Sequence, residues 1–260
     1  MNSNLLTFLK PAIAFTVTVS FTVLFIVFPR PPATAYPGEP DPMARRSSSS
    51  FILWLHGLGD SGPANEPIRD LFTSPEFKNT KWSFPSAPNN SVTCNHGAVM
   101  PSWFDIHEIP VSASSPKDEE SLLKAVQNVH AMIDNEVTHG TNPKDIFVCG
   151  FSQGGALTLA SVLLYPKTLG GCAVFSGWVP FNDSALENIT PEAKRTPILW
   201  SHGMADRTVL FEAGQAGPPF LGRAGIPCEF KAYPGLGHSI TQVELHYLES
   251  WIKARLQTSS

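Results

Sequence analysis

Ile146-Phe147-Val148-Cys149-Gly150-Phe151-Ser152-Gln153-Gly154 is an apolar run that leads into a serine with a glycine two residues before it and another two after it. Residues 146–150 are typical of a strand buried on both faces of a sheet, and the small residues over 154–164 predict a helix. A sharp turn between such elements holds a serine hydroxyl clear of neighbouring backbone, as a nucleophile requires. The alternative is a glycine-rich turn whose serine caps the helix. The position between strand and helix favours a nucleophilic role for Ser152.

The alternation of strand and helix patterns continues through residues 51–260. Apolar, strand-like runs occupy residues 51–55, 82–84, 146–150, 172–176, 198–202 and 228–233. Residues 115–118 offer an N-cap, a proline at the first helical position and a carboxylate, and apolar residues then recur at helical spacing over 122–137. A closing helix is predicted over 243–256. Strands separated by helices predict a doubly wound, mainly parallel α/β sheet in a single domain without a large lid.

Two further turns, each directly after a predicted strand, carry possible partners for Ser152. Asp206 ends the turn over 201–206, and His238 lies in the glycine-flanked loop over 234–239. An aspartate there can fix the tautomer of a histidine, which in turn accepts the serine proton. The alternatives are an aspartate paired with Arg207 and a plain surface histidine. The chain order serine, aspartate, histidine is that of the α/β hydrolases, so the sequence predicts an α/β-hydrolase fold with this triad.

The negative charge that develops on an attacked carbonyl oxygen needs hydrogen-bond donors. In this fold, one donor is the backbone N–H of the residue after the nucleophile, here Gln153. The second is expected in the turn after the first strand, residues 56–60, and we assign it to the N–H of Leu58. The alternative for this turn is a plain glycine loop. The histidines of the strand-end turns, His56 and His202, are expected to form structural hydrogen bonds.

Composition narrows the class of protein. The formal net charge is −4, 42% of the 260 residues are hydrophobic, and basic residues form no run that resembles a nucleic-acid surface. A nucleic-acid partner is therefore not expected. The four cysteines show neither zinc-like spacing nor a disulfide framework, which favours reduced thiols in the cytosol. Acyl transfer by the predicted triad needs no metal and no organic cofactor, so none is expected.

The N-terminus differs from the rest of the chain. Residues 11–29 carry no charge, and a stretch of about 19 residues is near the lower limit for a helix that crosses a bilayer. We therefore expect a membrane anchor within residues 1–29, a linker over 30–50 and the catalytic domain over 51–260. A signal peptide cleaved near residues 33–35 is the alternative. The excess of basic residues after the segment predicts a cytosolic catalytic domain, and translation from Met43 would give a soluble form.

Together the motifs resemble the acyl-protein thioesterase and lysophospholipase family of small carboxylesterases, over nearly all of residues 51–260. The resemblance rests on His56-Gly57-Leu58-Gly59-Asp60-Ser61-Gly62, Met100-Pro101-Ser102-Trp103-Phe104-Asp105, Gly150-Phe151-Ser152-Gln153-Gly154-Gly155, His202-Gly203 with Asp206, and Gly237-His238-Ser239. The middle and C-terminal segments resemble plant members of this family, among them a carboxylesterase that suppresses resistance elicited by a bacterial effector. This resemblance implies a small ester or an acylated protein as substrate, short-acyl esterase or deacetylase activity, and a link to the hypersensitive response.

Two departures from the family pattern bear on the acyl group. The residues after Asp206 are Arg207-Thr208-Val209-Leu210 instead of the usual proline-flanked valine, and residues 63–65 replace the usual aromatic and histidine residues. Both positions are expected near the acyl chain, so we expect short chains to be preferred. The residues expected to form the apolar acyl wall are Met100, Trp103, Phe104, Val209 and Leu210, each of which could equally belong to the core.

Two other functions remain open at this point. One is a lysophospholipase, phospholipase or long-chain acyl-protein thioesterase that the N-terminal segment brings to its substrate. The other is a non-catalytic ligand receptor on a hydrolase scaffold, which the presence of all three triad residues disfavours.

Overall fold

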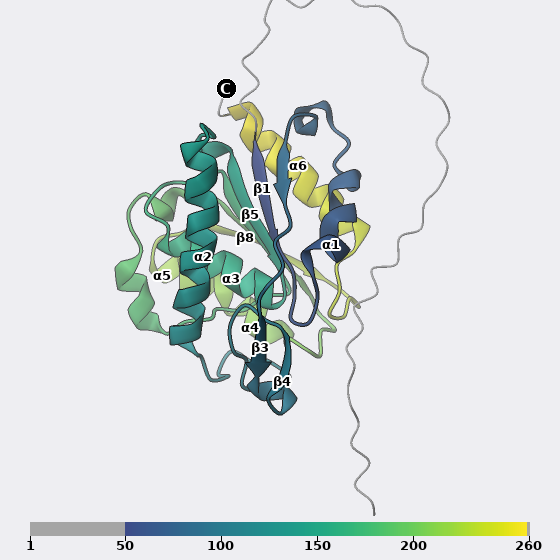
Figure 1. The fold of residues 1–260 in the computed structure, drawn as a ribbon, viewed down its shortest axis with the longest axis vertical. Helices are drawn as coiled ribbons and strands as arrows, with labels where there is room; N and C mark the ends of the chain where they lie inside the picture. Colours follow the sequence, from purple (N-terminus) through teal and green to yellow (C-terminus); the bar gives the residue numbers. More distant parts are fainter. Residues whose placement is uncertain (1–49, 259–260) are drawn as a thin grey trace, which may run out of the picture.

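The computed structural model describes residues 50–258, drawn as a ribbon in Figure 1. The predictions for residues 11–29, for most of the linker and for Met43 lie outside the described residues. Within residues 50–258, no helix combines the length and the apolar character that crossing a bilayer requires.

The core of the fold is a six-stranded sheet in which every neighbouring pair is parallel. Its order is β2-β1-β5-β6-β7-β8. The strands are β1 (Phe51–Leu55), β2 (Lys81–Ser83), β5 (Ile146–Phe151), β6 (Gly171–Phe175), β7 (Ile198–Gly203) and β8 (Cys228–Tyr233). The chain passes from β1 to the edge strand β2 and later returns to β5 on the other side of β1. In open α/β sheets, functional groups gather at the carboxyl ends of the strands around such a reversal.

Helices cover both faces of the sheet (Figure 1). They are α1 (Gly62–Asn65), α2 (Glu119–Thr138), α3 (Gln153–Leu164), α4 (Phe211–Gln215), α5 (Gly217–Arg223) and α6 (Gln242–Thr258). Alternate residues of β1 point to opposite faces, so Leu53 and Leu55 pack in the core beneath α2 and α3, whereas Ile52 and Trp54 pack in the core beneath α6. Burial on both faces explains the continuous apolar strands.

The start of α2 differs from the prediction. Its N-cap is Asp118, whose carboxylate accepts a hydrogen bond from the Ser121 N–H at 3.1 Å. Ser115, the N-cap expected from the sequence, instead donates to the Glu108 carboxylate. Lys117 donates to the Phe181 carbonyl at 2.7 Å. Side-chain partners outside the helix thus hold residues 115–117 in the preceding loop.

A two-stranded antiparallel sheet of β3 (Asn89–Val92) and β4 (Ala98–Pro101) was not predicted. His96 and Gly97 turn the chain with positive φ angles of 55° and 76°. The strands are short, and three of the four residues of β3 are polar and exposed, so they lack the apolar pattern by which a strand is recognised.

Candidate active site

Ser152 sits in a strained turn between β5 and α3, with φ 55° and ψ −120°. Gly150 and Gly154, on either side of Ser152, are required because neighbouring backbone atoms leave no room for a side chain at either position. A Cβ atom at Gly150 would lie 2.4 Å from the Gly154 carbonyl oxygen, and one at Gly154 would lie 2.1 Å from the Leu55 carbonyl oxygen. Strain of this kind costs about 1–3 kcal/mol and is held by the surrounding packing. The spacing of the glycines therefore follows from the turn that presents the serine.

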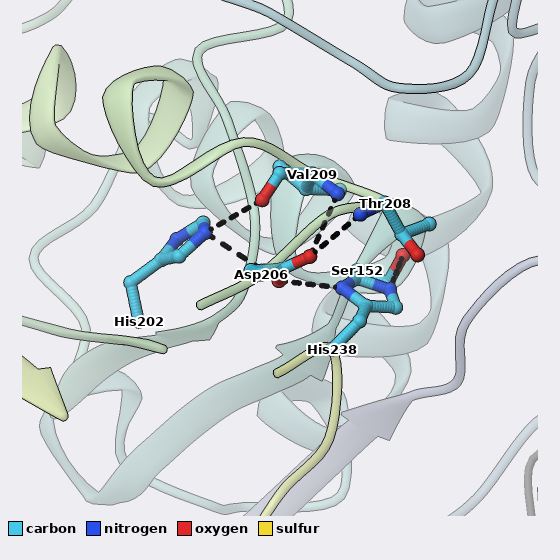
Figure 2. A network of polar contacts seen from close by, with 6 residues as sticks. All are labelled: Ser152, His202, Asp206, Thr208, Val209 and His238. Atoms are coloured by element: carbon cyan, nitrogen blue, oxygen red, sulfur yellow. Dashed lines mark hydrogen bonds and ion pairs between the residues drawn. The ribbon is translucent and has the colours of Figure 1, made fainter. Parts of the chain in front are cut away.

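The three predicted side chains meet at the carboxyl ends of β5, β7 and β8 (Figure 2). The Oγ of Ser152 lies 2.9 Å from Nε2 of His238, and Nδ1 of the same ring lies 2.7 Å from Oδ2 of Asp206. Because an ionised carboxylate only accepts, Nδ1 carries the proton and donates it, which leaves Nε2 free to accept from the serine hydroxyl. The geometry is that of a nucleophile, a base and a residue that orients the base.

The second oxygen of Asp206 is fixed by its own loop. Oδ1 accepts hydrogen bonds from the N–H groups of Thr208, at 2.9 Å, and Val209, at 3.0 Å. Burial by itself raises the pKa of this carboxyl, but the hydrogen bond and charge of His238 and the two backbone donors outweigh it and hold the pKa below its usual range. The carboxylate therefore stays ionised beside the imidazole at neutral pH.

A second histidine lies on the far side of Asp206, as Figure 2 shows. His202, at the end of β7, places Nε2 3.0 Å from the Val209 carbonyl oxygen and 3.6 Å from Oδ2 of Asp206. Burial lowers the pKa of His202, against the opposing hydrogen bond to Val209 and the charge of Asp206. The expected structural hydrogen bond is present, and it supports the loop that holds the acid.

The two backbone N–H groups expected to bind the oxyanion belong to residues next to the nucleophile in the chain or in space. Gln153 follows it directly as the first residue of α3. Leu58 follows Gly57, whose backbone runs so close to the serine that a Cβ atom there would lie 3.4 Å from Ser152 Cβ. The turn at the end of β1 and the start of α3 thus lie side by side next to Ser152.

The side chain of Gln153 has a role that the sequence did not reveal. It is fully buried, its amide nitrogen donates to Ser102 Oγ at 2.8 Å and to the Phe104 carbonyl at 2.6 Å, and its oxygen accepts from the Trp103 N–H at 3.1 Å. The Trp103 indole N–H in turn donates to the His56 carbonyl at 2.8 Å. The segment around Trp103 therefore ties the start of α3 to the end of β1.

The five residues predicted to form an acyl wall divide into two groups. Trp103, Phe104 and Val209 are buried in the core beneath α2 and α3, whereas Met100 and Leu210 are partly exposed. Of the three residues at the departure over 63–65, Asn65 is buried and its side chain bonds Trp54 and Asp60, whereas Pro63 and Ala64 are exposed.

Asp105, His107 and Asp118 have possible metal-ligating atoms within 4.8 Å of one another. Both carboxylates already accept structural hydrogen bonds: Asp105 from the N–H and hydroxyl of Thr93, and Asp118 from the N–H of Ser121. These hydrogen bonds to the loop at Thr93 and to the start of α2 explain the positions of the two carboxylates.

Comparison with known proteins identifies the family. The family model described as phospholipase/carboxylesterase matches residues 43–256. The chain belongs to this family. A probable carboxylesterase of Oryza sativa subsp. japonica, Os04g0669500, is 72% identical over 222 residues, which make up 85% of this chain and 84% of the relative. Carboxylesterase SOBER1 of Arabidopsis thaliana is 69% identical over 211 residues, which make up 81% of this chain and 92% of SOBER1.

Solved structures of the phospholipase/carboxylesterase family agree with the fold. The crystal structure of SOBER1 covers 80% of this chain and 99% of its own, with a TM-score of 0.79. That of acyl-protein thioesterase 2 from Zea mays is 31% identical and covers 80% of this chain and 94% of its own, with a TM-score of 0.69. The predicted α/β-hydrolase fold and family are confirmed, and the chain is a hydrolase of the carboxylesterase and thioesterase type.

Proposed function

We propose that this protein hydrolyses carboxylic esters or thioesters through an acyl-Ser152 intermediate. The observation that carries the proposal is the continuous chain of hydrogen bonds from Ser152 through His238 to Asp206, at 2.9 and 2.7 Å. The presence of this complete hydrogen-bonded triad also disfavours the alternative of a receptor without catalytic activity.

The proposed reaction proceeds in two halves. His238 Nε2 takes the proton of Ser152 Oγ as the oxygen attacks the carbonyl carbon, and the resulting oxyanion accepts hydrogen bonds from the N–H groups of Leu58 and Gln153. The tetrahedral intermediate collapses, the C–O or C–S bond breaks, and the leaving alcohol or thiol takes the proton from His238. A water molecule then attacks the acyl-serine with His238 as base, which releases the carboxylic acid and restores Ser152.

We further propose that short acyl groups are preferred. Val111, in the segment before α2, pairs with the loop that follows Asp206: its N–H donates to the Thr208 carbonyl at 2.8 Å, and its carbonyl accepts from the Leu210 N–H at 2.9 Å. It is buried, so it fills the space beside Val209, where the acyl wall was expected. The occupation of this space by Val111 favours an acetyl-sized group over a long chain.

The natural substrate is proposed to be a small ester or an acylated protein. A role in plant defence fits the likeness to SOBER1 of Arabidopsis thaliana. The membrane association proposed for residues 11–29 would bring the enzyme to substrates at a membrane surface.

A chain-length series tests the substrate class. The purified protein and its Ser152→Ala variant are assayed on p-nitrophenyl esters from acetate to palmitate and on a lysophospholipid. We expect kcat/KM to fall steadily beyond the shortest esters and Ser152→Ala to be inactive on all of them. Highest activity on palmitate or on the lysophospholipid would replace the short-acyl proposal by the lipase or long-chain thioesterase alternative. Turnover by Ser152→Ala would contradict the nucleophile itself.

A further inference from the structure

His56 is fully buried directly after β1, and its two ring nitrogens have partners of opposite kind. Nε2 lies 2.9 Å from the backbone nitrogen of Ala87, whose N–H can only donate, so Nε2 accepts. The ring proton of the neutral imidazole is therefore on Nδ1, which lies 2.7 Å from the Gly57 carbonyl oxygen and donates to it. The partners fix both the tautomer and the orientation of the ring.

The carbonyl that His56 binds belongs to the same peptide unit as the Leu58 N–H. A trans peptide is planar, with its C=O and N–H pointing in opposite directions. A hydrogen bond that draws the Gly57 oxygen toward the buried ring therefore turns the Leu58 N–H away from it. A Cβ atom at Gly57 would lie 3.4 Å from Ser152 Cβ, so the peptide unit that carries the Leu58 N–H begins beside the nucleophile.

From this geometry we propose that His56 is a positioning residue, which aims the Leu58 amide at the oxyanion by holding the Gly57 carbonyl from behind. The inference rests on the proposed function, because it assigns a support to one of the two donors named there. His56 does not touch the substrate. It acts through one peptide plane.

The surroundings of the ring keep it in this state. Its plane packs against the Trp103 indole, with ring centroids 5.0 Å apart, and the indole N–H holds the His56 carbonyl. Burial lowers the pKa of His56, against the opposing effects of the Gly57 hydrogen bond and the charge of Asp60. Protonation would also place an N–H on Nε2 opposite the N–H of Ala87. The ring is therefore suited to be a fixed neutral donor and unsuited to exchange protons with substrate.

Two substitutions separate the two hydrogen bonds. In His56→Asn, the amide nitrogen can replace Nδ1 and still donate to the Gly57 carbonyl, whereas the acceptor for Ala87 is lost. In His56→Gln, the longer side chain places its oxygen near the former Nε2 to accept from Ala87. The side-chain donor to Gly57 is lost, and only the weaker hydrogen bond from the Asp60 N–H, at 3.3 Å, still holds that carbonyl. Both variants lose the ring, so a purely structural role for its packing against Trp103 predicts similar effects in both.

We expect His56→Gln to lower kcat on p-nitrophenyl acetate by about 10²-fold, the effect of losing one oxyanion donor, with KM changed less than threefold. His56→Asn should retain kcat to within about tenfold, and only His56→Gln should lose affinity for a boronic acid that forms a tetrahedral adduct with serine. Equal kcat values in the two variants, or a larger loss in His56→Asn, would overturn the positioning role.

Two controls complete the test. Ser152→Ala is assayed alongside: if it retains activity, the proposed function fails, whereas an inactive Ser152→Ala with two fully active His56 variants refutes the inference alone. Should either His56 variant fail to fold, the ring nitrogen resonances of ¹⁵N-labelled wild-type protein decide. The proposal requires the Nδ1–H tautomer at His56 and is refuted by the Nε2–H tautomer.

Discussion

The Nε2 atom of His202 lies 3.0 Å from the carbonyl oxygen of Val209, the residue whose own N–H binds Oδ1 of Asp206. His202 thus supports the Asp206 carboxylate through Val209, and Asp206 in turn orients His238. His202→Leu leaves the buried carbonyl without its donor, at a cost of about 1–3 kcal/mol. We expect kcat to fall about tenfold with KM unchanged. His202→Gln, whose amide nitrogen can occupy the former Nε2 position, should retain most of the wild-type kcat.

Steady-state kinetics and one-dimensional proton spectra check the His202 prediction together. The downfield resonance of the proton between His238 and Asp206 should weaken or disappear in His202→Leu and remain in His202→Gln. A His202→Leu variant with unchanged kcat and an unchanged downfield resonance would show that Asp206 needs no such support.

Gly154 faces the Leu55 carbonyl oxygen at a distance that leaves no room for a side chain. Gly154→Ala is expected to lower the free energy of unfolding by about 3 kcal/mol and to abolish activity, because the new methyl group must push β1 and α3 apart next to Ser152. Gly222→Ala is the matched control, since a Cβ atom at this helical position meets nothing within 4 Å. It should stabilise the protein by about 0.5–1 kcal/mol. Urea unfolding and esterase assays measure both, and similar effects in the two variants would contradict the account of the turn.

Gln153 combines a backbone donor with a buried side chain that joins three groups around Trp103. Gln153→Glu keeps the shape but removes both N–H donors and sets a charge against the Phe104 carbonyl. We expect a loss of stability of about 3–5 kcal/mol, as is typical when an uncompensated charge is buried. Gln153→Met, which removes the hydrogen bonds without a charge, should lose less. Chemical denaturation of the two variants is the measurement, and a glutamate variant as stable as the methionine one would argue against this environment.

Glu244 is buried near the start of α6, where its Oε2 accepts from the N–H and hydroxyl of Thr241 at 2.8 and 2.9 Å. Burial raises the pKa of this carboxyl, against the opposing hydrogen bonds from Thr241. Because the pKa is higher in the folded state, the associated stability is present below the unfolded pKa, near 4.3, and is lost as the pH rises through the folded value. Glutamine has no such titration, so the Tm of Glu244→Gln relative to wild type should increase from pH 4 to pH 8.

Thermal unfolding at several pH values measures this difference. Glu187→Gln, at an exposed position, serves as the control and should show a much smaller change with pH. A difference between Glu244→Gln and wild type that stays constant with pH would contradict the linkage.

Much of this architecture follows from local sequence patterns. Strands β1, β5 and β6 are continuous apolar runs because both of their faces are covered. Ser152 is recognisable because the glycines on either side of it are required by close contacts with neighbouring backbone. Asp206 and His238 were predicted from their places after strands, and the parallel topology of the sheet brings both to Ser152.

Contacts between segments that are distant in the chain could not be predicted from the sequence. Nothing local at Gln153 shows that its side chain meets Phe104, 49 positions earlier in the chain. The start of α2 was misplaced because the partners of Ser115 and Lys117 decide it, and those lie outside the helix. The buried packing of Val111 on Val209 likewise emerges only from tertiary structure, and it bears most directly on acyl-chain length.

The central claim is that Ser152 carries the acyl group between two chemical steps. The most direct measurement is intact-protein and peptide mass spectrometry after rapid mixing with p-nitrophenyl acetate and acid quenching within milliseconds. We predict one acetyl group per molecule, on the peptide that contains Ser152, forming at the rate of the p-nitrophenol burst, and none in Ser152→Ala. Turnover without an acetylated Ser152 peptide, or acetylation and turnover that survive Ser152→Ala, would contradict the claim.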